Sequence, residues 1–542
     1  MSPRRAPRLV RALGALALLA SLAQAGGESS TVGETLYRRG MHASGAPLEA
    51  TRDGGIGVSG APAACVNCHR RSGLGMVEGR QSIPPIAASY LFHPRAGTVD
   101  DLDLPFVENM RADRDPYTAD TLARAIRAGI AADGKPLSFL MPRYALDDGE
   151  MAQLISYLGQ LSPRDVPGVT PDVLHFATII TPDADPAKRA GMLDVLNKFF
   201  EDKNRFTRAQ APRLRSSRRM MFKVNRHWAL HVWELSGDPD TWEAQLRAHL
   251  AAQPVFAVLS GLGGRTWEPI HRFCTRQALP CLFPNVERPV VAEDDFETLY
   301  LSQGVLLEAR LIARALAAQQ AQPPRRIVQV FRAGDVGMDG AQALAAALHR
   351  PDIAVVNRSM ANAGGRELAA ALRGVGPGDA LVLWLRAPDV ARLPAPPRAV
   401  AAVYLSGQMA GLERAPLPAA WRPPALLAYP YDLPERRRVR LDFPLGWFRI
   451  RQIPVVAEQV QVDTYLVCGL VSDTLNHMVD TFVRDYLVER IEGMLEHRVI
   501  TGYYPRLALA PGQRFASKGG YLVRFVGTTG TRVVPEGDWT VP

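Results

Sequence analysis

The residues best suited to chemistry in this chain are Cys65, Cys68 and His69, which stand together as Cys-Val-Asn-Cys-His. Two thiols at this spacing can add to the two vinyl groups of one haem, and the adjacent histidine can ligate its iron. Thioredoxin-like redox pairs and halves of zinc sites share the spacing. A redox pair should open a helix after a strand, but Gly54–Ala64 reads as a loop rich in Gly and Ala. A zinc site needs a second ligand pair, and residues 26–162 contain no further CxxC or HxxxH. The motif therefore predicts one covalently attached haem c.

The iron of such a haem needs a second axial ligand opposite His69. Met76 is too close to His69 in sequence to reach the opposite face, and Met151 stands on the apolar side of an expected helix. Met141 is followed by Pro142, which fixes the backbone of its loop, and then by a helix. We therefore expect Met141 as the sixth ligand. The remaining candidates in this block are Met41, His42, His93 and Met110.

Two protein ligands would leave no open coordination site on the iron. Oxygen and peroxide chemistry is then disfavoured, and single-electron transfer is the function that these residues predict. The chain has one CxxCH motif, so one haem would both receive and deliver electrons. Motifs of serine hydrolases, zinc proteases and phosphate-binding loops are missing from the sequence. We expect an electron carrier and not an enzyme.

Residues 1–25 have the pattern of an export signal. Arginines from Arg4 to Arg11 precede an apolar stretch, Ala12–Ala20, that is too short to span a bilayer. Ala23-Gln24-Ala25 then provides a small-x-small cleavage site. The pattern predicts a periplasmic protein with no stable membrane span after cleavage.

The composition excludes several classes of protein. With 542 residues, 47% of them hydrophobic and 22% charged, the chain has material for about three folded domains. Its formal charge of +9 falls to +5 without the leader arginines, which are not part of any basic stripe. We therefore expect no binding to nucleic acid. Five cysteines are too few for a disulfide-stapled scaffold.

The chain divides into a Gly-rich block at 26–162, a Pro-containing linker at 163–171 and a long block at 172–542. The long block alternates short apolar runs with amphipathic stretches, which predicts parallel βαβ units. Expected strands lie at 173–180, 227–234, 255–260, 280–283, 326–332, 353–358, 380–385 and 400–405. Expected helices lie at 186–201, 241–251, 266–277, 304–318, 340–348 and 365–373. A single long helix is expected at 463–497, and the tail from Val499 should add strands.

Residues 32–161 resemble the class I c-type cytochromes. The resemblance rests on Gly33, Tyr37 and Gly40, the CxxCH motif, Met141-Pro142, and Leu154, Tyr157 and Leu158 in a final helix. It implies an all-α domain in which the first and last helices cross, with Gly33 and Tyr37 against Tyr157. It also implies that a carbonyl near Pro84-Pro85 accepts a hydrogen bond from His69.

The long block resembles the type I periplasmic binding proteins, the branched-chain amino-acid receptor family of ABC importers. The resemblance is one of pattern, with lobes at about 172–300 and 301–462 and a return through the helix at 463–497. Asp335-Val-Gly-Met-Asp-Gly340 looks like the acidic turn that opens the second lobe in that family. The alternative is a generic doubly wound α/β domain.

One turn at the expected ligand edge stands out. Ser260, Gly263, Gly264 and Arg265 belong to a Gly-rich strand-to-helix turn whose backbone N–H groups could hold an anion. Asp335 is a further candidate ligand residue. Receptors of the family hold the amino-acid carboxylate with hydroxyl side chains at this turn, whereas glycines stand here, so amino-acid binding is not expected. The alternative is a tight turn without a ligand.

The remaining cysteines and histidines carry weaker predictions. Cys274 and Cys281 flank a helix end and the next strand, so a disulfide between them is plausible after export. Cys468 stands among apolar residues and is expected in a core. His227 and His231 share one face of a strand without a third ligand, so a metal site is not expected.

Together the two resemblances imply an exported fusion in which a monohaem electron carrier is joined to a solute-binding-like domain. That domain would bind a small organic ligand or dock a redox partner, such as a periplasmic dehydrogenase or an oxidase-linked cytochrome. The alternative is a ligand-sensing or transport-linked receptor in which the haem is regulatory. A catalytic α/β domain is the other rival, but the sequence offers no acid–base cluster for it.

Overall fold

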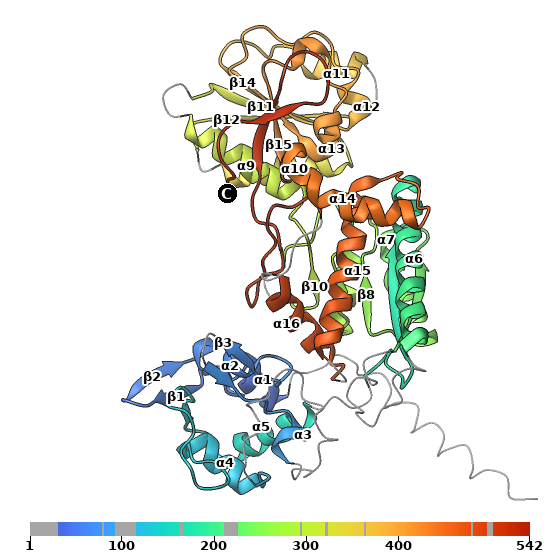
Figure 1. The fold of residues 1–542 in the computed structure, drawn as a ribbon. Coiled ribbons are helices and arrows are strands. Elements are labelled where there is room, and N and C mark those ends of the chain that lie inside the picture. Colours follow the sequence, from blue (N-terminus) through green and yellow to red (C-terminus); the bar gives the residue numbers. More distant parts are fainter. Residues whose placement is uncertain are drawn as a thin grey trace, which may run out of the picture. The chain divides into compact units, whose positions relative to one another are not determined.

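The computed structural model describes residues 31–78, 81–92, 115–161, 166–210, 226–292, 295–319, 323–348, 350–361, 365–478, 481–495 and 502–542. The chain forms two compact units, residues 1–96 with 109–162 and residues 97–108 with 163–542 (Figure 1). The expected export signal at residues 1–25 lies outside the described residues. None of the helices in the described ranges is long and apolar enough to cross a membrane.

The first unit combines short helices with two small sheets, so the expectation of an all-α domain is wrong. Its helices are α1 (Val32–Arg39), α2 (Val66–His69), α3 (Ala88–Leu91), α4 (Ala119–Ala128) and α5 (Asp148–Gln160). One sheet has the order β2-β1-β5, formed by β1 (Glu49–Arg52), β2 (Ile56–Ser59) and β5 (Arg143–Tyr144). The other pairs β3 (Met76–Glu78) with β4 (Gln81–Ile83). The β1–β2 hairpin turns through Gly54 and Gly55, whose φ angles of 82° and 76° suit glycine.

Helices α1 and α5 cross in close contact, as the sequence predicted. A Cβ on Gly33 would lie 2.2 Å from the carbonyl oxygen of Gln153 and 2.8 Å from Cβ of Tyr157, so only glycine permits this approach. The rings of Tyr37 and Tyr157 pack 5.3 Å apart. The Tyr37 hydroxyl donates a hydrogen bond of 2.6 Å to the carbonyl of Arg70, directly after the CxxCH motif. The crossing therefore ties α1 and α5 to the segment that bears the cysteines.

The second unit has two α/β lobes, as expected. The sheet of the first lobe is parallel, with the order β10-β9-β8-β6-β7. Its helices include α6 (Pro186–Gln210), α7 (Pro239–Ala252) and α8 (Glu268–Arg276). Side chains of α7 and α8 bury a core against the sheet that includes Trp233, Trp242 and Phe273. The strands are β6 (Val173–Ile180), β7 (His227–Glu234), β8 (Ala257–Leu259), β9 (Cys281–Leu282) and β10 (Thr298–Leu299).

The second lobe has a sheet in the order β12-β11-β13-β14-β15-β16-β17. The first five strands are parallel, and the tail adds β16 and β17 antiparallel, as its composition predicted. The strands are β11 (Arg326–Arg332), β12 (Ala354–Met360), β13 (Asp379–Trp384), β14 (Ala402–Ser406), β15 (Ala425–Tyr429), β16 (Tyr521–Phe525) and β17 (Val533–Pro535). The helices are α9 (Val305–Ala318), α10 (Val336–Ala347), α11 (Gly365–Ala371), α12 (Ala387–Val390) and α13 (Gly407–Ala410).

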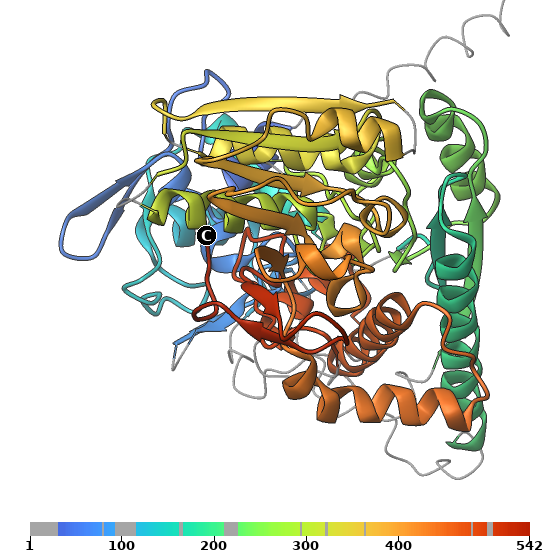
Figure 2. The same ribbon diagram turned by 90° about the horizontal axis from the view of Figure 1, so that it is seen from above.

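The chain returns to the first lobe earlier than expected, through α14 (Pro434–Ile450). Trp447 of α14 packs against Phe199 of α6, and α15 (Glu458–Met478) packs along α6 (Figures 1 and 2). The single helix expected at 463–497 is two helices, α15 and α16 (Arg484–Leu495). The chain leaves the helical path at Phe482, which is buried against Phe256 of the first lobe. Tertiary packing overrides the helical periodicity at this point.

Candidate functional site

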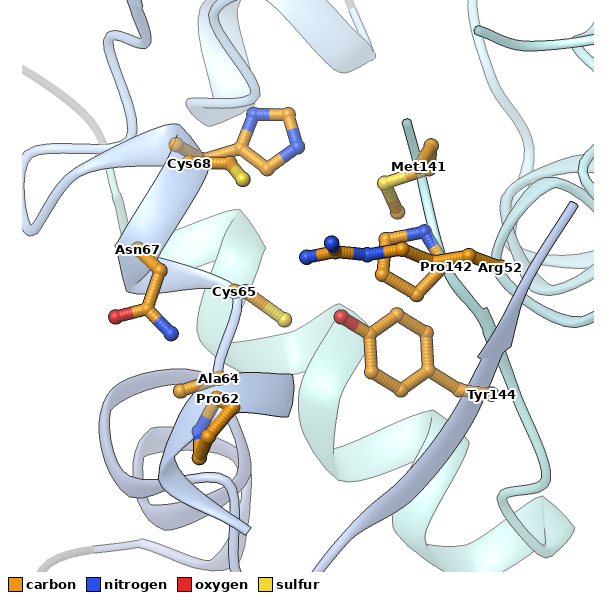
Figure 3. A pocket seen from close by; sticks show the side chains of 10 residues that line it. Arg52, Pro62, Ala64, Cys65, Asn67, Cys68, Met141, Pro142 and Tyr144 are labelled. Atoms are coloured by element: carbon orange, nitrogen blue, oxygen red, sulfur yellow. The ribbon is translucent and has the colours of Figure 1, made fainter. Parts of the chain in front are cut away.

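The four residues expected to hold a haem line one pocket of the first unit. The residues that line it are Arg52, Pro62, Ala64, Cys65, Asn67, Cys68, His69, Met141, Pro142 and Tyr144. Figure 3 shows the side chains of Cys65, Met141 and Tyr144 turned toward the same space, with the Arg52 guanidinium between them. Helix α2 brings the CxxCH side to the pocket. The loop before β5 brings Met141 to it.

His69 is oriented for ligation through one ring nitrogen. Its Nδ1 lies 3.0 Å from the carbonyl oxygen of Pro84, as the sequence predicted. Burial lowers the pKa of His69, and the hydrogen bond to Pro84 opposes that shift without cancelling it. A neutral imidazole that donates from Nδ1 presents its lone pair on Nε2. Its Nε2 is therefore available as a ligand atom.

The CxxC pair is a poor candidate for thioredoxin-like redox chemistry. Burial raises the pKa of Cys65 to about 12, against a smaller opposing effect of its hydrogen bond with Tyr144. Because the thiolate is the reactive form in thiol–disulfide exchange, the raised pKa disfavours that exchange at Cys65. A 3₁₀ turn at Ala61–Ala63 precedes the motif, in place of the strand that a thioredoxin-like pair requires. Both observations argue against a redox pair at this motif.

Arg52 gives a test of whether the pocket suits a haem. Its Nε is enclosed and has no hydrogen-bond partner among the described residues. An enclosed N–H group without a partner costs free energy unless a hydrogen-bond acceptor meets it. A haem carries two propionate groups besides the vinyl groups that thiols can attack. The residues that line this pocket therefore fit a haem.

The other candidate axial ligands that the structure describes do not reach the pocket. Met151 is buried in the core on α5, and His42 lies 2.8 Å from the Glu150 carboxylate through its Nδ1. Met41 and Met76 are not among the lining residues. His93 and Met110 lie outside the described residues. Met141 remains the sixth ligand that we expect.

In the second unit, the backbone N–H groups of the 260–265 turn already have acceptors. Gly264 donates to Oγ1 of Thr181 at 2.9 Å, and Arg265 donates to Oδ2 of Asp183 at 2.6 Å. Gly263 donates to the carbonyl of Asn285 at 3.3 Å. A Cβ on Gly264 would lie 2.2 Å from Cγ of Asp183. The expectation that these donors await an external anion is therefore wrong, because the Asp183 carboxylate is the anion at this turn.

The other two predicted ligand residues also have partners within the chain. Ser260 is buried with a φ of 57°, and its hydroxyl lies 3.3 Å from Oγ1 of Thr464. Asp335 caps α10 by accepting from the N–H of Val336 at 2.8 Å, and it pairs with Arg386 at 2.7 Å. The candidate ligand residues thus stand at one edge of the two lobes and are used by the fold itself.

Ion pairs join the two lobes at this edge. Arg265 and Arg288 of the first lobe both pair with Asp339 of the second, the latter at 2.9 Å. Arg386 of the second lobe pairs with Glu287 of the first at 2.8 Å. Burial alone would raise the pKa of Glu287, but the neighbouring cations outweigh it and hold that pKa down to about 2. Glu287 is therefore ionised at any physiological pH.

The sequence did not single out a buried polar cluster near the crossovers. Glu308 on α9 is fully buried, and its Oε1 accepts a hydrogen bond of 2.9 Å from the N–H of Gln408. Burial raises the pKa of Glu308 to about 8 and that of Asp463 on α15 to about 7. The Tyr431 hydroxyl accepts from Gln408 at 2.7 Å. The sequence did contain one sign of this cluster, because Glu308 stands on the apolar side of the helix expected at 304–318.

The remaining predictions concern cysteines and histidines. Cys274 and Cys281 are buried free cysteines whose thiols hydrogen-bond, so their disulfide stays a prediction. Cys468 is buried in α15, as expected. The structure adds a partner to His231, whose Nε2 lies 3.0 Å from Nδ1 of His175. Within the described ranges, no three His, Cys, Asp or Glu side chains are grouped so that they could hold a metal ion.

Comparisons with known proteins return matches in structure alone. No protein-family model matches the chain, and no curated protein matches it in sequence. A fatty-acid ABC transporter substrate-binding protein from Thermomonospora curvata is similar at 13% identity and a TM-score of 0.46, over 70% of this chain and 95% of that one. A branched-chain amino-acid ABC transporter from Thermus thermophilus with bound valine is similar at 10% identity and a TM-score of 0.48, over 69% and 97%. A leucine-binding protein from Thermotoga maritima is similar at 11% identity and a TM-score of 0.47, over 67% and 98%.

Proposed function

We propose that this protein is a periplasmic monohaem electron carrier whose first unit is a c-type cytochrome domain. The observation that carries the proposal is the convergence of Cys65, Cys68, His69 and Met141 on one pocket. These are the residue types that a covalently attached, six-coordinate haem requires. The export pattern of residues 1–25 agrees with it, because haem attachment of this kind accompanies export.

Each residue of the pocket has a separate task in this proposal. Cys65 and Cys68 would form thioether bonds with a haem, and His69 would supply Nε2 while Pro84 fixes its ring through Nδ1. Met141 would supply its thioether sulfur to the iron and would keep water and small ligands from it. A haem held there would supply one-electron exchange at its iron. Arg52 would place a positive charge near an acidic group of the haem.

For the second unit, we propose a solute-binding-like domain of the type I periplasmic kind, with two α/β lobes. It binds a small organic ligand or docks the protein that exchanges electrons with the first unit, such as a periplasmic dehydrogenase or an oxidase-linked cytochrome. The lobes support this proposal because their parallel strands end at a shared edge, where such folds place their ligands.

The two-lobed arrangement also supports a second candidate function, a ligand-sensing or transport-linked receptor in which the haem is regulatory. The two candidates differ in what a ligand does to the haem. A receptor requires that a bound ligand shift the haem potential, whereas a carrier with a docking domain keeps the same potential with or without small molecules. Potentiometric titration of the full chain with and without a metabolite panel separates them.

The haem itself is tested by two measurements on the exported full-length protein. After denaturation and extraction with acidified acetone, the pigment should stay with the polypeptide, on a proteolytic fragment that contains Cys65–His69. Pigment that is released, or protein that carries none, would refute the proposal. The Met141→Ala variant should lose the weak near-infrared band of sulfur bound to ferric iron and should bind small ligands. Met41→Ala is the matched control, because Met41 belongs to the same unit but does not line the pocket.

A further inference from the structure

The edge between the two lobes of the second unit holds four cationic and four anionic residues in contact with one another. The cations are Arg265, Arg288 and Arg386, with Lys188 on α6 as a fourth. The anions that they meet are Asp183, Glu287, Asp335 and Asp339. These side chains stand at the strand ends and turns where an α/β fold of two lobes would hold a solute.

Three of the ion pairs join residues of different lobes. Arg265 and Arg288 come from the first lobe and share Asp339, which lies in the first turn of α10 in the second lobe. Arg386 comes from the second lobe, and its guanidinium reaches both Glu287 of the first lobe, at 2.8 Å, and Asp335, at 2.7 Å. Separation of the lobes would break all three of these pairs.

The pairs are more protected than ordinary surface pairs. The side chain of Asp339 is 13% exposed and that of Glu287 is 24% exposed. Glu287 is also bound by Lys188 at 3.1 Å, and its backbone carbonyl accepts from the N–H of Val305 at 3.0 Å, where the chain enters the second lobe. Charges that are partly removed from water attract each other more strongly and are screened less by salt.

The 260–265 turn, which could hold an anion, is likewise occupied by a side chain of the protein, Asp183. The Asp183 carboxylate accepts from the N–H of Arg265 at 2.6 Å and from the hydroxyl of Thr181 at 2.6 Å. Arg265 thus binds an anion of its own lobe through its backbone and an anion of the other lobe through its side chain. No donor named above at the 260–265 turn is left for a free carboxylate.

From these contacts we infer that the second unit closes on its own side chains, so that its lobes stay together without a solute and do not respond to one. Asp183, Asp339 and the Glu287–Arg386 pair take the positions at which charged groups of a ligand would bridge the lobes. This inference is independent of the haem, and among the roles proposed above for the second unit it favours docking over ligand sensing.

The test measures the distance between the lobes in the full-length protein. Spin labels are attached at two exposed positions, Asp240→Cys on α7 of the first lobe and Ala370→Cys on α11 of the second. The distance distribution is recorded by pulsed electron paramagnetic resonance. In the otherwise unchanged protein we expect a single narrow distribution, and millimolar L-valine, L-glutamate or succinate should leave it as it is.

The second arm of the test removes the pairs. Asp339→Asn combined with Arg386→Gln should shift the distribution to longer distances by more than its original width. Asp352→Asn is the matched control, because Asp352 pairs with Arg350 within the second lobe and that pair does not join the lobes. The control should not shift the distribution. A broad or two-peaked distribution that one of the solutes narrows would overturn the inference, and so would an unchanged distance in the double variant. Circular dichroism checks that the double variant folds. If it does not, the response of the unchanged protein to the solutes decides the matter alone.

Discussion

Replacing Glu308 by Gln should remove much of the loss of stability that the second unit suffers as the pH rises. Burial raises the pKa of Glu308 from its ordinary 4.5 to about 8, more than the hydrogen bonds from Ser406 and Gln408 lower it. Between these two values the unfolded chain ionises at this position while the folded chain does not. The stability that the neutral carboxyl provides is therefore present at low pH and is lost as the pH rises through 8.

The magnitude follows from the size of the shift. One pKa unit corresponds to about 1.4 kcal/mol, so the loss between pH 5 and pH 8 is about 3 kcal/mol. Glutamine keeps the geometry of the neutral acid, because its oxygen can accept from the N–H of Gln408 and its amide can donate to the Ser406 hydroxyl. Asp463 titrates in both proteins, so its contribution cancels in the comparison.

Urea unfolding followed by tryptophan fluorescence measures this difference. All eight tryptophans lie between Trp228 and Trp539, so the signal reports on the second unit. The free energy of unfolding of Glu308→Gln, minus that of the parent protein, should rise by about 3 kcal/mol between pH 5 and pH 8. Glu435→Gln, at an exposed position of α14, is the control and should run parallel to the parent. Parallel curves for Glu308→Gln as well would show that Glu308 ionises normally and that our account of its burial is wrong.

Three further predictions concern other sites. Gly33→Ala should destabilise the first unit by about 1–3 kcal/mol, because the new methyl group overlaps the Gln153 carbonyl, and thermal denaturation followed by haem absorbance would measure it. An unchanged melting temperature would contradict the close crossing. Arg52→Gln should lower the haem potential by on the order of tens of millivolts, because loss of a nearby positive charge favours the ferric state; a potential that stays the same would place Arg52 away from the haem. Alkylation of the denatured, exported protein should find one thiol, Cys468, if Cys274 and Cys281 are joined, and three thiols would exclude the disulfide.

Much of the second unit was predictable because apolar residues recur at different intervals in its strands and in its helices. The strands at Val173–Ile180, His227–Glu234 and Arg326–Arg332 have the bounds that their apolar runs predicted. The break between α15 and α16 was not predictable, since residues on both sides keep helical spacing and the contact of Phe482 with Phe256 joins positions far apart in the sequence. The early return through α14 was also missed, and α14 contains Pro444, a residue that ordinarily interrupts a helical pattern.

In the first unit, the sequence predicted the residues of the pocket but not the β-strands around them. The CxxCH motif and Met141 line one pocket as their spacing predicted, and the carbonyl of Pro84 meets His69 as the resemblance to cytochromes implied. The hairpin between β1 and β2 was taken for a loop, although Asp53-Gly54 is a strong turn signal. That hairpin matters for the site, because it brings Arg52 to the pocket, and Arg52 is not among the residues on which the resemblance to cytochromes rests.

The 260–265 turn shows where a sequence stops being informative about ligands. A Gly-rich turn at the end of a parallel strand exposes backbone N–H groups, and buried donors require acceptors. The pattern therefore predicts an anion at the turn, and an anion is present. The sequence cannot tell whether the anion is a solute or a side chain that arrives from another strand end, because Asp183 lies about eighty residues away and ordinary spacing rules do not connect the two. Glycine at position 264 is explained by the carboxylate itself, since any Cβ there would collide with it. At position 264, therefore, the missing side chain makes room for the Asp183 carboxylate and not for a ligand.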